Sequence, residues 1–329
     1  MSTIEKDQNH SLLDEVSIDE SKINELIEKY DAESRYRKLT GLQGKFITAW
    51  LCAMSLFHLY TAGIATMPIT IQRAIHLTFA IVAVYILFPA GRKGSKTSTP
   101  IYDWILAALA GGVIGYIIFF FNDIARRGAE PLPYEIWLGI AAIILVLEAG
   151  RRVVGNVLPC MSILFLLYCH FGYMVPGMFQ IRGYTLSRII QHMYLTPEGI
   201  FGLALGVSAT FVIVFIIFGA FLSQSGGARF FNELALAVAG GTPGGPAKVA
   251  VVASGLLGTI NGSSVANVAT TGTFTIPLMK RVGYPPHYAG AVEACASTGG
   301  QLMPPIMGAA AFLMADYLGV PYSDICDSK

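Results

Sequence analysis

Residues 261–264, Asn-Gly-Ser-Ser, form a short polar run that could bind an ion. Apolar stretches flank it at residues 249–260 and 265–279. If both stretches are helical, the first presents carbonyl groups to the run and the second presents free amides. Carbonyl and hydroxyl oxygens suit a hard cation such as Na⁺, and amides suit a carboxylate. The pattern therefore predicts a site for small ions.

The two flanking stretches are too short to cross a bilayer. Helices of about 12 and 15 residues reach roughly 18–22 Å, whereas the hydrocarbon core is about 30 Å thick. Lys248 precedes the first stretch, and Lys280 and Arg281 end the second. Because cationic residues tend to stay on the cytoplasmic side, we expect both ends there. The sequence thus predicts a re-entrant helical hairpin over residues 248–281, with its tip near the midplane.

A broken helix is predicted after the hairpin, over residues 287–319. Residues 287–297 have the composition of a half-helix, and the following Thr-Gly-Gly-Gln at 298–301 loses the helical pattern. Pro304-Pro305 is expected to restart the helix toward Ala315, because proline is favourable at a first helical position. Secondary transporters bind ions and substrates at the midplane with this combination of hairpin and broken helix.

Polar side chains near the predicted tip could serve as ligands. Hydroxyl groups lie at the tip and at the helix break, and an amide and two hydroxyls are spaced three and four residues apart on the second hairpin helix, where they should share one face. The alternative is that these groups only form hydrogen bonds between helices. The residues are Ser263, Ser264 and Thr298, and Asn267, Thr270 and Thr271.

Glu293 is the acidic residue of the predicted half-helix at 287–297. A carboxylate inside a membrane is a candidate functional group. Glu293 lies about two helical turns from the cytoplasmic end, so a structural ion pair with Arg281 is the alternative.

Composition places the chain among membrane proteins. Of 329 residues, 54% are hydrophobic and 13% are charged, against about 25% charged in soluble domains. The net charge of +1 gives no support for a nucleic-acid partner. The five cysteines form no CxxC pair, and neither a GxSxG motif nor histidines at ligand spacing occur. We therefore expect no enzyme, no organic cofactor and no metal beyond Na⁺.

The chain order predicts six crossings with a cytoplasmic amino terminus. Residues 1–45 are a charged leader, in which Ile23, Leu26, Ile27 and Tyr30 indicate an amphipathic helix or, alternatively, a solvated tail. Cationic residues before the first span, in the second loop and after the fourth span support this orientation. The predicted spans are 46–65, 71–90, 101–121, 134–150, 153–173 and 200–224, and a short helix at 228–239 is expected to lie along the inner interface.

Two segments resemble a known family. GGPAKVAVVASGLLGTINGSSVANVATTGTFTIPLMKRVGYPP and ASTGGQLMPPIMGAAAFLMA resemble the large membrane subunit of tripartite ATP-independent periplasmic (TRAP) transporters, and in particular the fused permeases of the TAXI subclass. The resemblance implies an all-α polytopic inner-membrane protein that is half of an inverted-repeat elevator transporter. Residues 46–152 would be a four-helix small-subunit-like region, and residues 153–329 would be the first half of the large subunit.

The resemblance also implies function and site residues. It implies Na⁺-coupled uptake of a small carboxylate delivered by a periplasmic solute-binding protein of TAXI type. The residues implied for Na⁺ binding are Gly262, Ser263, Ser264, Asn267, Thr298, Gly299 and Gly300. Those implied for substrate binding are Asn261, Ser264, Asn267, Thr270, Gln301 and Pro304.

The sequence departs from the family in one respect. Family members contain a second, inverted half with its own hairpin and broken helix. The sequence ends at Lys329, after the first broken helix, so we expect a truncated or partial product. The alternative functions are a non-transporting membrane fragment and a passive channel-like protein, although no carbonyl-filter repeat or charged ring is present.

Overall fold

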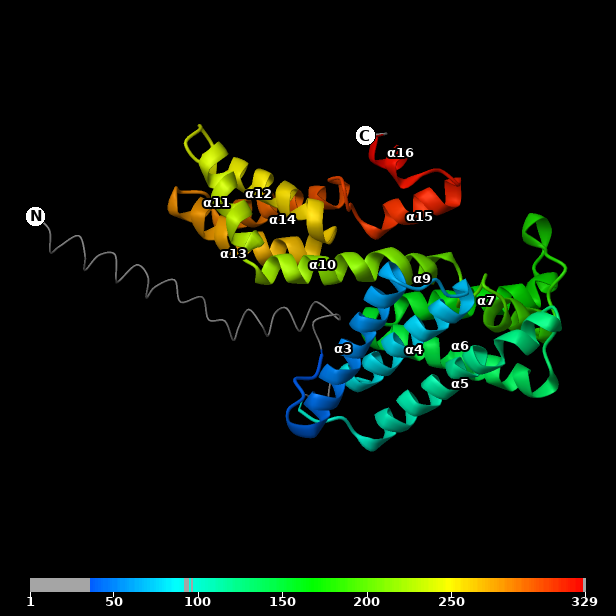
Figure 1. Ribbon diagram of the computed structural model, residues 1–329. Coiled ribbons are helices and arrows are strands. Elements are labelled where there is room, and N and C mark those ends of the chain that lie inside the picture. The colour runs from blue at the N-terminus through cyan, green and yellow to red at the C-terminus, as the bar shows by residue number, and fades with distance from the viewer. Residues whose placement is uncertain (1–35, 92–94, 96, 328–329) are drawn as a thin grey trace, which may run out of the picture. The chain divides into compact units, whose positions relative to one another are not determined.

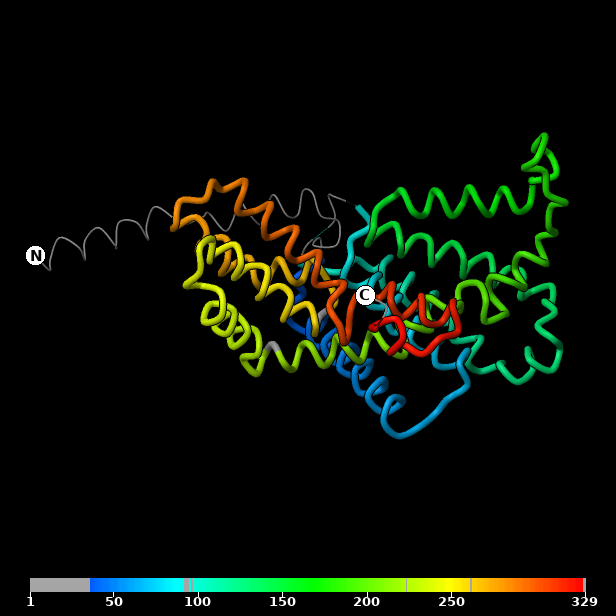
Figure 2. The backbone as a smooth tube through the Cα atoms, turned by 90° about the horizontal axis from the view of Figure 1, so that it is seen from above, coloured from blue at the N-terminus to red at the C-terminus, as the bar shows by residue number. Residues whose placement is uncertain are grey.

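The computed structural model describes residues 36–91, 95 and 97–327, and every regular element within them is a helix. Figures 1 and 2 trace these elements. The described chain forms two compact units, residues 36–52 with 74–200 and residues 53–73 with 201–327. The predicted all-α polytopic membrane fold is confirmed. The predicted amphipathic helix around residues 23–30 lies outside the described residues.

The first unit is built from long helices. Helices α3 (Gly41–Gly63) and α4 (Ile69–Leu87) each contribute residues to both units. The other elements of the first unit are α5 (Ile101–Arg126), α6 (Pro133–Val154), α7 (Val157–Phe171), η1 (Gly172–Met174), η2 (Gly177–Phe179), α8 (Leu186–Ile190) and η3 (Gln191–Leu195).

The second unit contains the segment for which an ion site is predicted. Its elements are α9 (Leu203–Val207), η4 (Ser208–Val212), α10 (Ile213–Gln224), α11 (Gly227–Ala239), α12 (Gly245–Asn261), α13 (Ser264–Arg281), α14 (Pro286–Gly299), η5 (Gly300–Leu302), α15 (Ala309–Leu318) and α16 (Tyr322–Asp327). Figure 2 shows α12, α13 and α14, in yellow and orange, running alongside one another.

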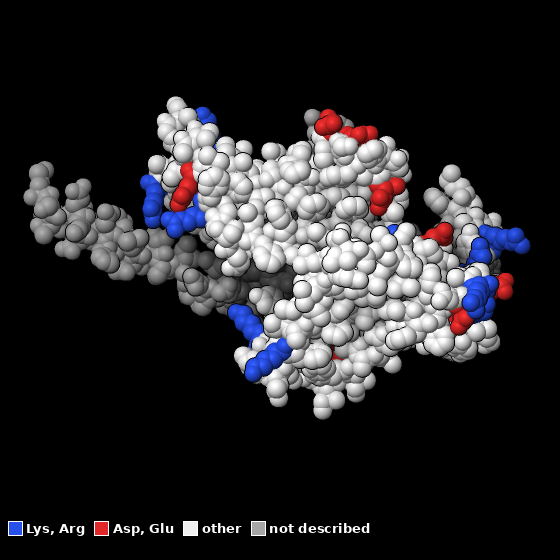
Figure 3. All heavy atoms as spheres, viewed as in Figure 1, with Lys and Arg blue, Asp and Glu red and all other residues white. Residues whose placement is uncertain are grey.

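Five helices of the described chain are long and apolar enough to cross a membrane. They are Gly41–Gly63, Ile69–Leu87, Ile101–Arg126, Val157–Met174 and Leu203–Leu222, which correspond to five of the six predicted spans. The remaining predicted span, 134–150, lies within the 22-residue helix α6, which is not among the five. Figure 3 shows that charged side chains are sparse on the visible surface of each part.

The boundary between α6 and α7 differs from the prediction. Arg151 and Arg152 were expected in a loop, but they occupy the last turn of α6. Cations are favourable at that end of a helix, and Gly155, with φ 96°, lies just after it. The division into a small-subunit-like region at 46–152 and the first half of a large subunit at 153–329 stays a prediction.

The connection between the spans at α7 and α9 contains the short helices α8 and η3. Ile190 is buried, and its side chain packs against Gly139 of α6. After η3, the Thr196 hydroxyl donates to the His192 carbonyl at 2.8 Å, a Glu198 carboxylate oxygen lies 3.2 Å from Nδ1 of His192, and the next helix begins at Leu203.

The short helix predicted at 228–239 is α11, with 13 residues. Ala235 and Ala239 are buried against Val249 and Ala253 of α12. Small residues on both helices allow this close packing. Helix α11 thereby supports one side of the predicted hairpin.

Candidate functional site

The hairpin consists of α12 and α13, joined at Gly262 and Ser263. Gly262 ends α12 in the left-handed conformation with φ 57°, which glycine adopts without a steric penalty. Ser263 begins α13 as its N-cap, and its hydroxyl accepts a hydrogen bond from the Ala266 amide at 3.4 Å. The helices have 17 and 18 residues, fewer than the roughly 20 needed to span a membrane. The predicted helical hairpin is confirmed, and its re-entrant placement stays a prediction.

The start of α12 and the end of α13 lie at the same end of the helix bundle. Ala250 near the start of α12 and Met279 near the end of α13 share a buried apolar cluster with Ala289 of α14. Lys248 and Arg281 therefore extend from one end, where both are exposed. That this end faces the cytoplasm stays a prediction.

The hairpin tip packs directly against the break that follows η5. A Cβ atom at Gly262 would lie 1.9 Å from the carbonyl oxygen of Met307, so no larger residue fits there without movement. The Gln301 side-chain amide donates to the Ser264 hydroxyl at 3.2 Å. The Gly308 amide in turn donates to the Gln301 carbonyl at 2.8 Å. The structure thus brings the predicted tip and the predicted break together.

The break begins later than predicted. Helix α14 continues through Thr298 to Gly299, a single 3₁₀ turn follows, and α15 begins at Ala309 rather than at Pro304. Pro304 and Pro305 are exposed and lie in the turn between the half-helices. A residue before proline is pushed out of the helical region, so Pro304 cannot readily start a helix in front of Pro305.

Gly299 and Gly300, both predicted at the Na⁺ site, differ in how closely other atoms pack against them. Gly300 and Gly258 of α12 approach so closely that a Cβ at residue 258 would lie 2.3 Å from the Gly300 Cα atom. A Cβ at Gly300 would lie 2.6 Å from Nδ2 of Asn267. A Cβ at Gly299 would meet nothing within 4 Å. Close packing therefore requires Gly300, and the space around residue 299 does not require glycine.

A buried polar cluster lies between α12, α13 and α14, and Glu293 is its centre. The hydroxyls of Thr271 and Thr275 contact the two carboxylate oxygens, one each. Ser297 donates to Oε1 at 3.0 Å, and Ser254 lies 3.4 Å from the same oxygen. All these side chains are buried with no exposed surface, as is Asn267. We call Ser254, Asn267, Thr271, Thr275, Glu293 and Ser297 the hydroxyl cluster.

Glu293 forms no ion pair with any described residue, so the predicted alternative of a pair with Arg281 is wrong. Arg281 is exposed at the foot of the hairpin, whereas Glu293 points into the bundle. A buried charge is normally paired or rich in hydrogen bonds, and here hydroxyl groups supply those bonds.

Asn267 links the hydroxyl cluster to the hairpin tip. Its Nδ2 donates to the Ser254 carbonyl at 2.8 Å, and its backbone carbonyl accepts from the Thr271 hydroxyl at 2.8 Å. Its Oδ1 is buried and has no hydrogen-bond partner among the described residues. A buried acceptor without a donor is costly, so this oxygen is an available ligand for a cation.

Other predicted ligands lie elsewhere. Thr270 was expected on the same face as Asn267 and Thr271, but it is only half-buried and its hydroxyl donates to the Ala266 carbonyl. Thr298 is exposed, and its hydroxyl donates to the Ala294 carbonyl at 2.8 Å. A three-residue step rotates a helical position by less than a turn, so Thr270 falls at the edge of the buried face. Asn261 ends α12, and its side chain is outside the description.

Sequence reasoning missed Ser254, Thr275 and Ser297. Two of them follow a detectable rule, because Thr275 is four residues after Thr271 and Ser297 is four residues after Glu293. Ser254 faces them from another helix, and no local spacing indicates that contact.

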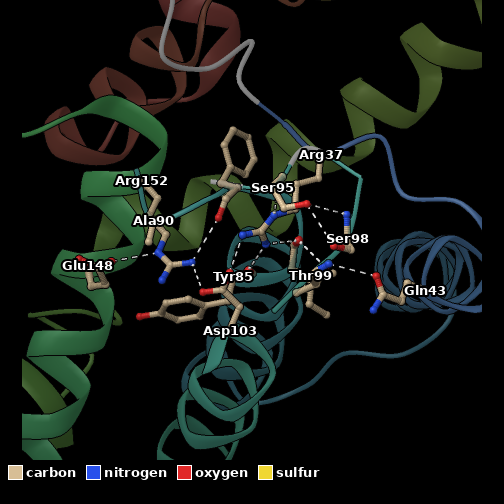
Figure 4. Close-up of polar contacts among 12 residues, drawn as sticks. Arg37, Gln43, Tyr85, Ala90, Ser95, Ser98, Thr99, Asp103, Glu148 and Arg152 are labelled. Carbon is tan, nitrogen blue, oxygen red and sulfur yellow. Dashed lines mark hydrogen bonds and ion pairs between the residues drawn. The ribbon is translucent and has the colours of Figure 1, made fainter. Parts of the chain in front are cut away.

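A second buried carboxylate, Asp103 on α5, lies in the first unit and has entirely different partners (Figure 4). Arg37 donates to its Oδ2 at 2.6 Å and Arg152 donates to its Oδ1 at 2.7 Å. Both guanidinium groups also reach backbone carbonyls at the end of α4, and Glu148 accepts from Arg152 at 3.0 Å. Together, Arg37, Asp103, Glu148 and Arg152 form the guanidinium cluster, which joins the ends of three helices to the segment before α3.

Glu135 repeats this kind of pairing in the same unit. Arg127 donates to its two carboxylate oxygens at 2.7 and 3.0 Å, and Tyr116 donates at 2.6 Å. The hydrogen bond to Glu135 raises the pKa of Arg127. These bonds hold the end of α5 and the residue after it against the first turn of α6, so the role of Glu135 is structural.

A short helical hairpin packed by its tip against a broken helix is the architecture of a secondary transporter. The family model of the tripartite ATP-independent periplasmic transporter, DctM component, matches residues 141–327. The chain therefore belongs to this family and is a multi-pass inner-membrane protein.

Curated relatives agree with the family. The chain is 33% identical over 152 residues to the C4-dicarboxylate TRAP transporter large permease protein DctM of Pseudomonas aeruginosa, covering 44% of this chain and 36% of that protein. It is 29% identical over 168 residues to the protein of the same name from Vibrio cholerae, covering 50% and 33%. It is 35% identical over 91 residues to the isethionate TRAP transporter permease protein DctMQ of Oleidesulfovibrio alaskensis, covering 28% and 14%.

The chain spans about a third or less of the length of these relatives. No solved structure matches it.

Proposed function

We propose that the chain is a permease component of a Na⁺-coupled TRAP transporter that imports a small carboxylate across the bacterial inner membrane. Its partner is a periplasmic solute-binding protein, of TAXI type by the sequence resemblance, and its amino terminus is cytoplasmic. Family membership supports the transporter class, and the names of two relatives include a C4-dicarboxylate, which is a small carboxylate. The single observation that carries the proposal is the packing of the Gly262 tip against Met307 in the helix break.

Asn267 and Ser264 are the side chains of this chain that fit a Na⁺ site best. The buried Oδ1 of Asn267 has no donor among the described residues, and the Ser264 hydroxyl keeps accepting capacity beside its bond from Gln301. Thr298 fits poorly because its hydroxyl is exposed and donates to its own helix. Oxygen ligands of this kind bind hard cations.

The proposed carboxylate site lies at the first amides of α13, on the other side of the hairpin tip from the proposed Na⁺ site. The first amides of α13 carry the positive end of that helix, which favours an anion. Gln301 and Pro304 are exposed next to the tip and are available to a substrate. In the proposed transport cycle, the hairpin and broken helix move together against a static scaffold to which the region 46–152 contributes.

The test is uptake into proteoliposomes that contain the complete transporter with its solute-binding protein. Asn267→Ala should raise the Na⁺ concentration for half-maximal uptake by about tenfold or more, because it removes an oxygen ligand. Asn267→Asp keeps an oxygen and should retain Na⁺ dependence. Thr298→Val is the matched control, and its uptake should resemble that of the unchanged protein. A folded Asn267→Ala variant with unchanged Na⁺ dependence would refute this site.

A further inference from the structure

An apolar groove of about 460 Å³ lies beside the start of the hairpin, and none of its lining residues belongs to the hydroxyl cluster. Helices α11 and α14 both pack against α12, and the groove is lined by all three. Its volume is within the range of about 300–1,000 Å³ that is typical of ligand sites. The apolar walls are formed by Val238 and Ala239 of α11, Ala247, Val251 and Val252 of α12, and Val292 of α14.

Core packing fixes the floor of the groove. Val252 packs against the buried alanines that α11 and α12 share. Ala247 and Val292 pack against a second buried cluster, which is formed by α12, α13 and α14. Alanine has no side-chain rotamers, and valine is stiff at χ1. The groove is therefore a preformed feature of the bundle. Because Val238 and Val251 on its walls are exposed, it is also open to the surroundings.

The polar groups of the groove lie where α12 begins. Thr242, in the turn before α12, donates its hydroxyl hydrogen to the Ala239 carbonyl at 2.9 Å, so its oxygen keeps accepting capacity. Lys248, in the first turn of α12, is exposed and forms no ion pair with any described residue. The groove thus combines an apolar channel with one cationic group at its end.

The same end of the bundle carries further positive charge. Lys280 and Arg281, at the end of α13, are exposed there. Helices α11 to α14 contain two acidic residues, of which Glu233 pairs with Arg229 and Glu293 is buried in the hydroxyl cluster. The electrostatic field at this end of the groove therefore favours an anion.

Two tyrosines mark the change from apolar to polar surface. Tyr284 packs against the buried cluster that also holds Ala247 and Val292, and its ring stacks on that of Tyr288 with centroids 5.8 Å apart. Tyr288 is exposed. Tyrosine is enriched at the level where lipid chains meet headgroups. The sequence of valine, tyrosine and lysine along this surface matches the polarity of a lipid from chain to headgroup.

We propose that the groove binds a phospholipid with an anionic headgroup. One acyl chain lies along the valines of α11, α12 and α14, and the phosphate lies at Lys248. The protein is embedded in a membrane, so an apolar groove that is open to its surroundings meets lipid chains. The cationic end then selects among headgroups by charge. A chain held in this position bridges α11 and the hairpin bundle. Lipid binding does not depend on the proposed transport of Na⁺ and a carboxylate.

The test is a lipid titration of the purified full chain in detergent, followed by native mass spectrometry. Dioleoyl phosphatidylglycerol and dioleoyl phosphatidylcholine have the same acyl chains, so a difference between them reports on the headgroup charge. The first phosphatidylglycerol should bind several-fold more tightly than the first phosphatidylcholine. Equal affinities would overturn the proposal.

Lys248→Gln tests the headgroup position. It should weaken binding of the first phosphatidylglycerol about fivefold and leave phosphatidylcholine unchanged, because one lysine near an anionic lipid contributes roughly that factor. Arg229→Gln is the matched control, because Arg229 is an exposed cation on α11 that does not line the groove. Unchanged phosphatidylglycerol binding by Lys248→Gln, or an equal loss in both variants, would overturn the proposal.

Val251→Trp tests the chain position, because an indole ring at this exposed position occupies the groove. The first lipid of either kind should bind several-fold more weakly. Val282→Trp is the control, because Val282 is similarly exposed at the end of α13 and does not line the groove. Full lipid binding by Val251→Trp would overturn the proposal. A lipid-free dimer that Val251→Trp abolishes would also overturn it, by assigning the groove to a second copy of the chain.

Discussion

Asp103 and Glu293 are both carboxylates without exposed surface, but their surroundings are opposite in character. Asp103 lies between two guanidinium groups at 2.6 and 2.7 Å. Glu293 contacts only hydroxyl groups among the described residues. The first arrangement compensates the carboxylate with positive charge, because arginine does not lose its proton in proteins. The second supplies hydrogen bonds from hydroxyl groups and no cationic partner among the described residues.

The partners of the two acids lie in different parts of the fold. Asp103 joins Arg37, the end of α4 and the end of α6, so its pairing holds helix ends in place. Glu293 lies about two turns before the end of α14 at Gly299, and the Thr271 hydroxyl reaches both Glu293 and the Asn267 carbonyl. The two acids are equally buried, so the feature that separates them is the presence or absence of cationic partners among the described residues.

The largest effect is expected for Asp103→Asn. The substitution removes the carboxylate that pairs with the buried Arg37 and leaves Arg152 with Glu148, which should lower the free energy of unfolding by about 3–5 kcal/mol. Thermal or denaturant unfolding in detergent would measure the loss. As a control, Asp123→Asn should change little, because Asp123 is exposed in a weak pair at 3.9 Å. A stable Asp103→Asn variant would contradict the structural role of the guanidinium cluster.

The second-largest loss of stability is expected at Gly300, which packs against Asn267 of the hydroxyl cluster. Gly300→Ala places a Cβ 2.6 Å from Asn267 Nδ2 and should cost about 1–3 kcal/mol of stability through overpacking. Gly299→Ala meets nothing within 4 Å and should be neutral or slightly stabilising. Melting temperatures of the two variants provide the comparison. Equal destabilisation would mean that the approach between α12 and η5 is looser than described.

A smaller effect is expected at Tyr85, beside the guanidinium cluster. Its hydroxyl donates to the Leu145 carbonyl at 2.8 Å, while its ring lies 4.8 Å from the Arg152 guanidinium carbon. Tyr85→Phe removes the hydrogen bond and keeps the ring, so the loss should be about 1 kcal/mol. Tyr317→Phe, at a highly exposed position, is the control for the measurement by thermal unfolding. A loss near that of Asp103→Asn would show that the cluster depends on this hydroxyl.

The smallest effect is expected for Glu293→Gln. Glutamine has the shape of a protonated glutamate and can donate to and accept from the surrounding hydroxyls, so stability should fall by less than about 1 kcal/mol. Thermal unfolding in detergent would measure the loss. A loss as large as that of Asp103→Asn would erase the distinction between the two acids.

Local residues made much of the second unit predictable. The apolar runs on either side of Gly262, together with Ser263 as an N-cap, indicated two short helices and a sharp connection. The break after α14 was predicted too early, because Thr298 and Gly299 remain helical once Gly300 packs against Gly258. Glycine weakens a helix but does not end it where tertiary packing favours close approach.

The candidate site was predicted in part, because ligands on one helix follow its period and ligands on different helices do not. Asn267 and Thr271 were named from their spacing, but Thr270 was wrongly placed with them. Ser254 meets Glu293 only because α12 packs against α14. The contacts of Asp103 with Arg37 and Arg152 join residues 66 and 49 positions apart, a separation over which no sequence period operates.

By itself, the sequence determined that the chain is an all-helical membrane protein with a short hairpin before a broken helix, because apolar length and glycine or proline positions act locally. Only the tertiary structure decided that Glu293 has hydroxyl partners while Asp103 has guanidinium partners. The charge state of a buried carboxylate depends on the groups that other helices bring to it.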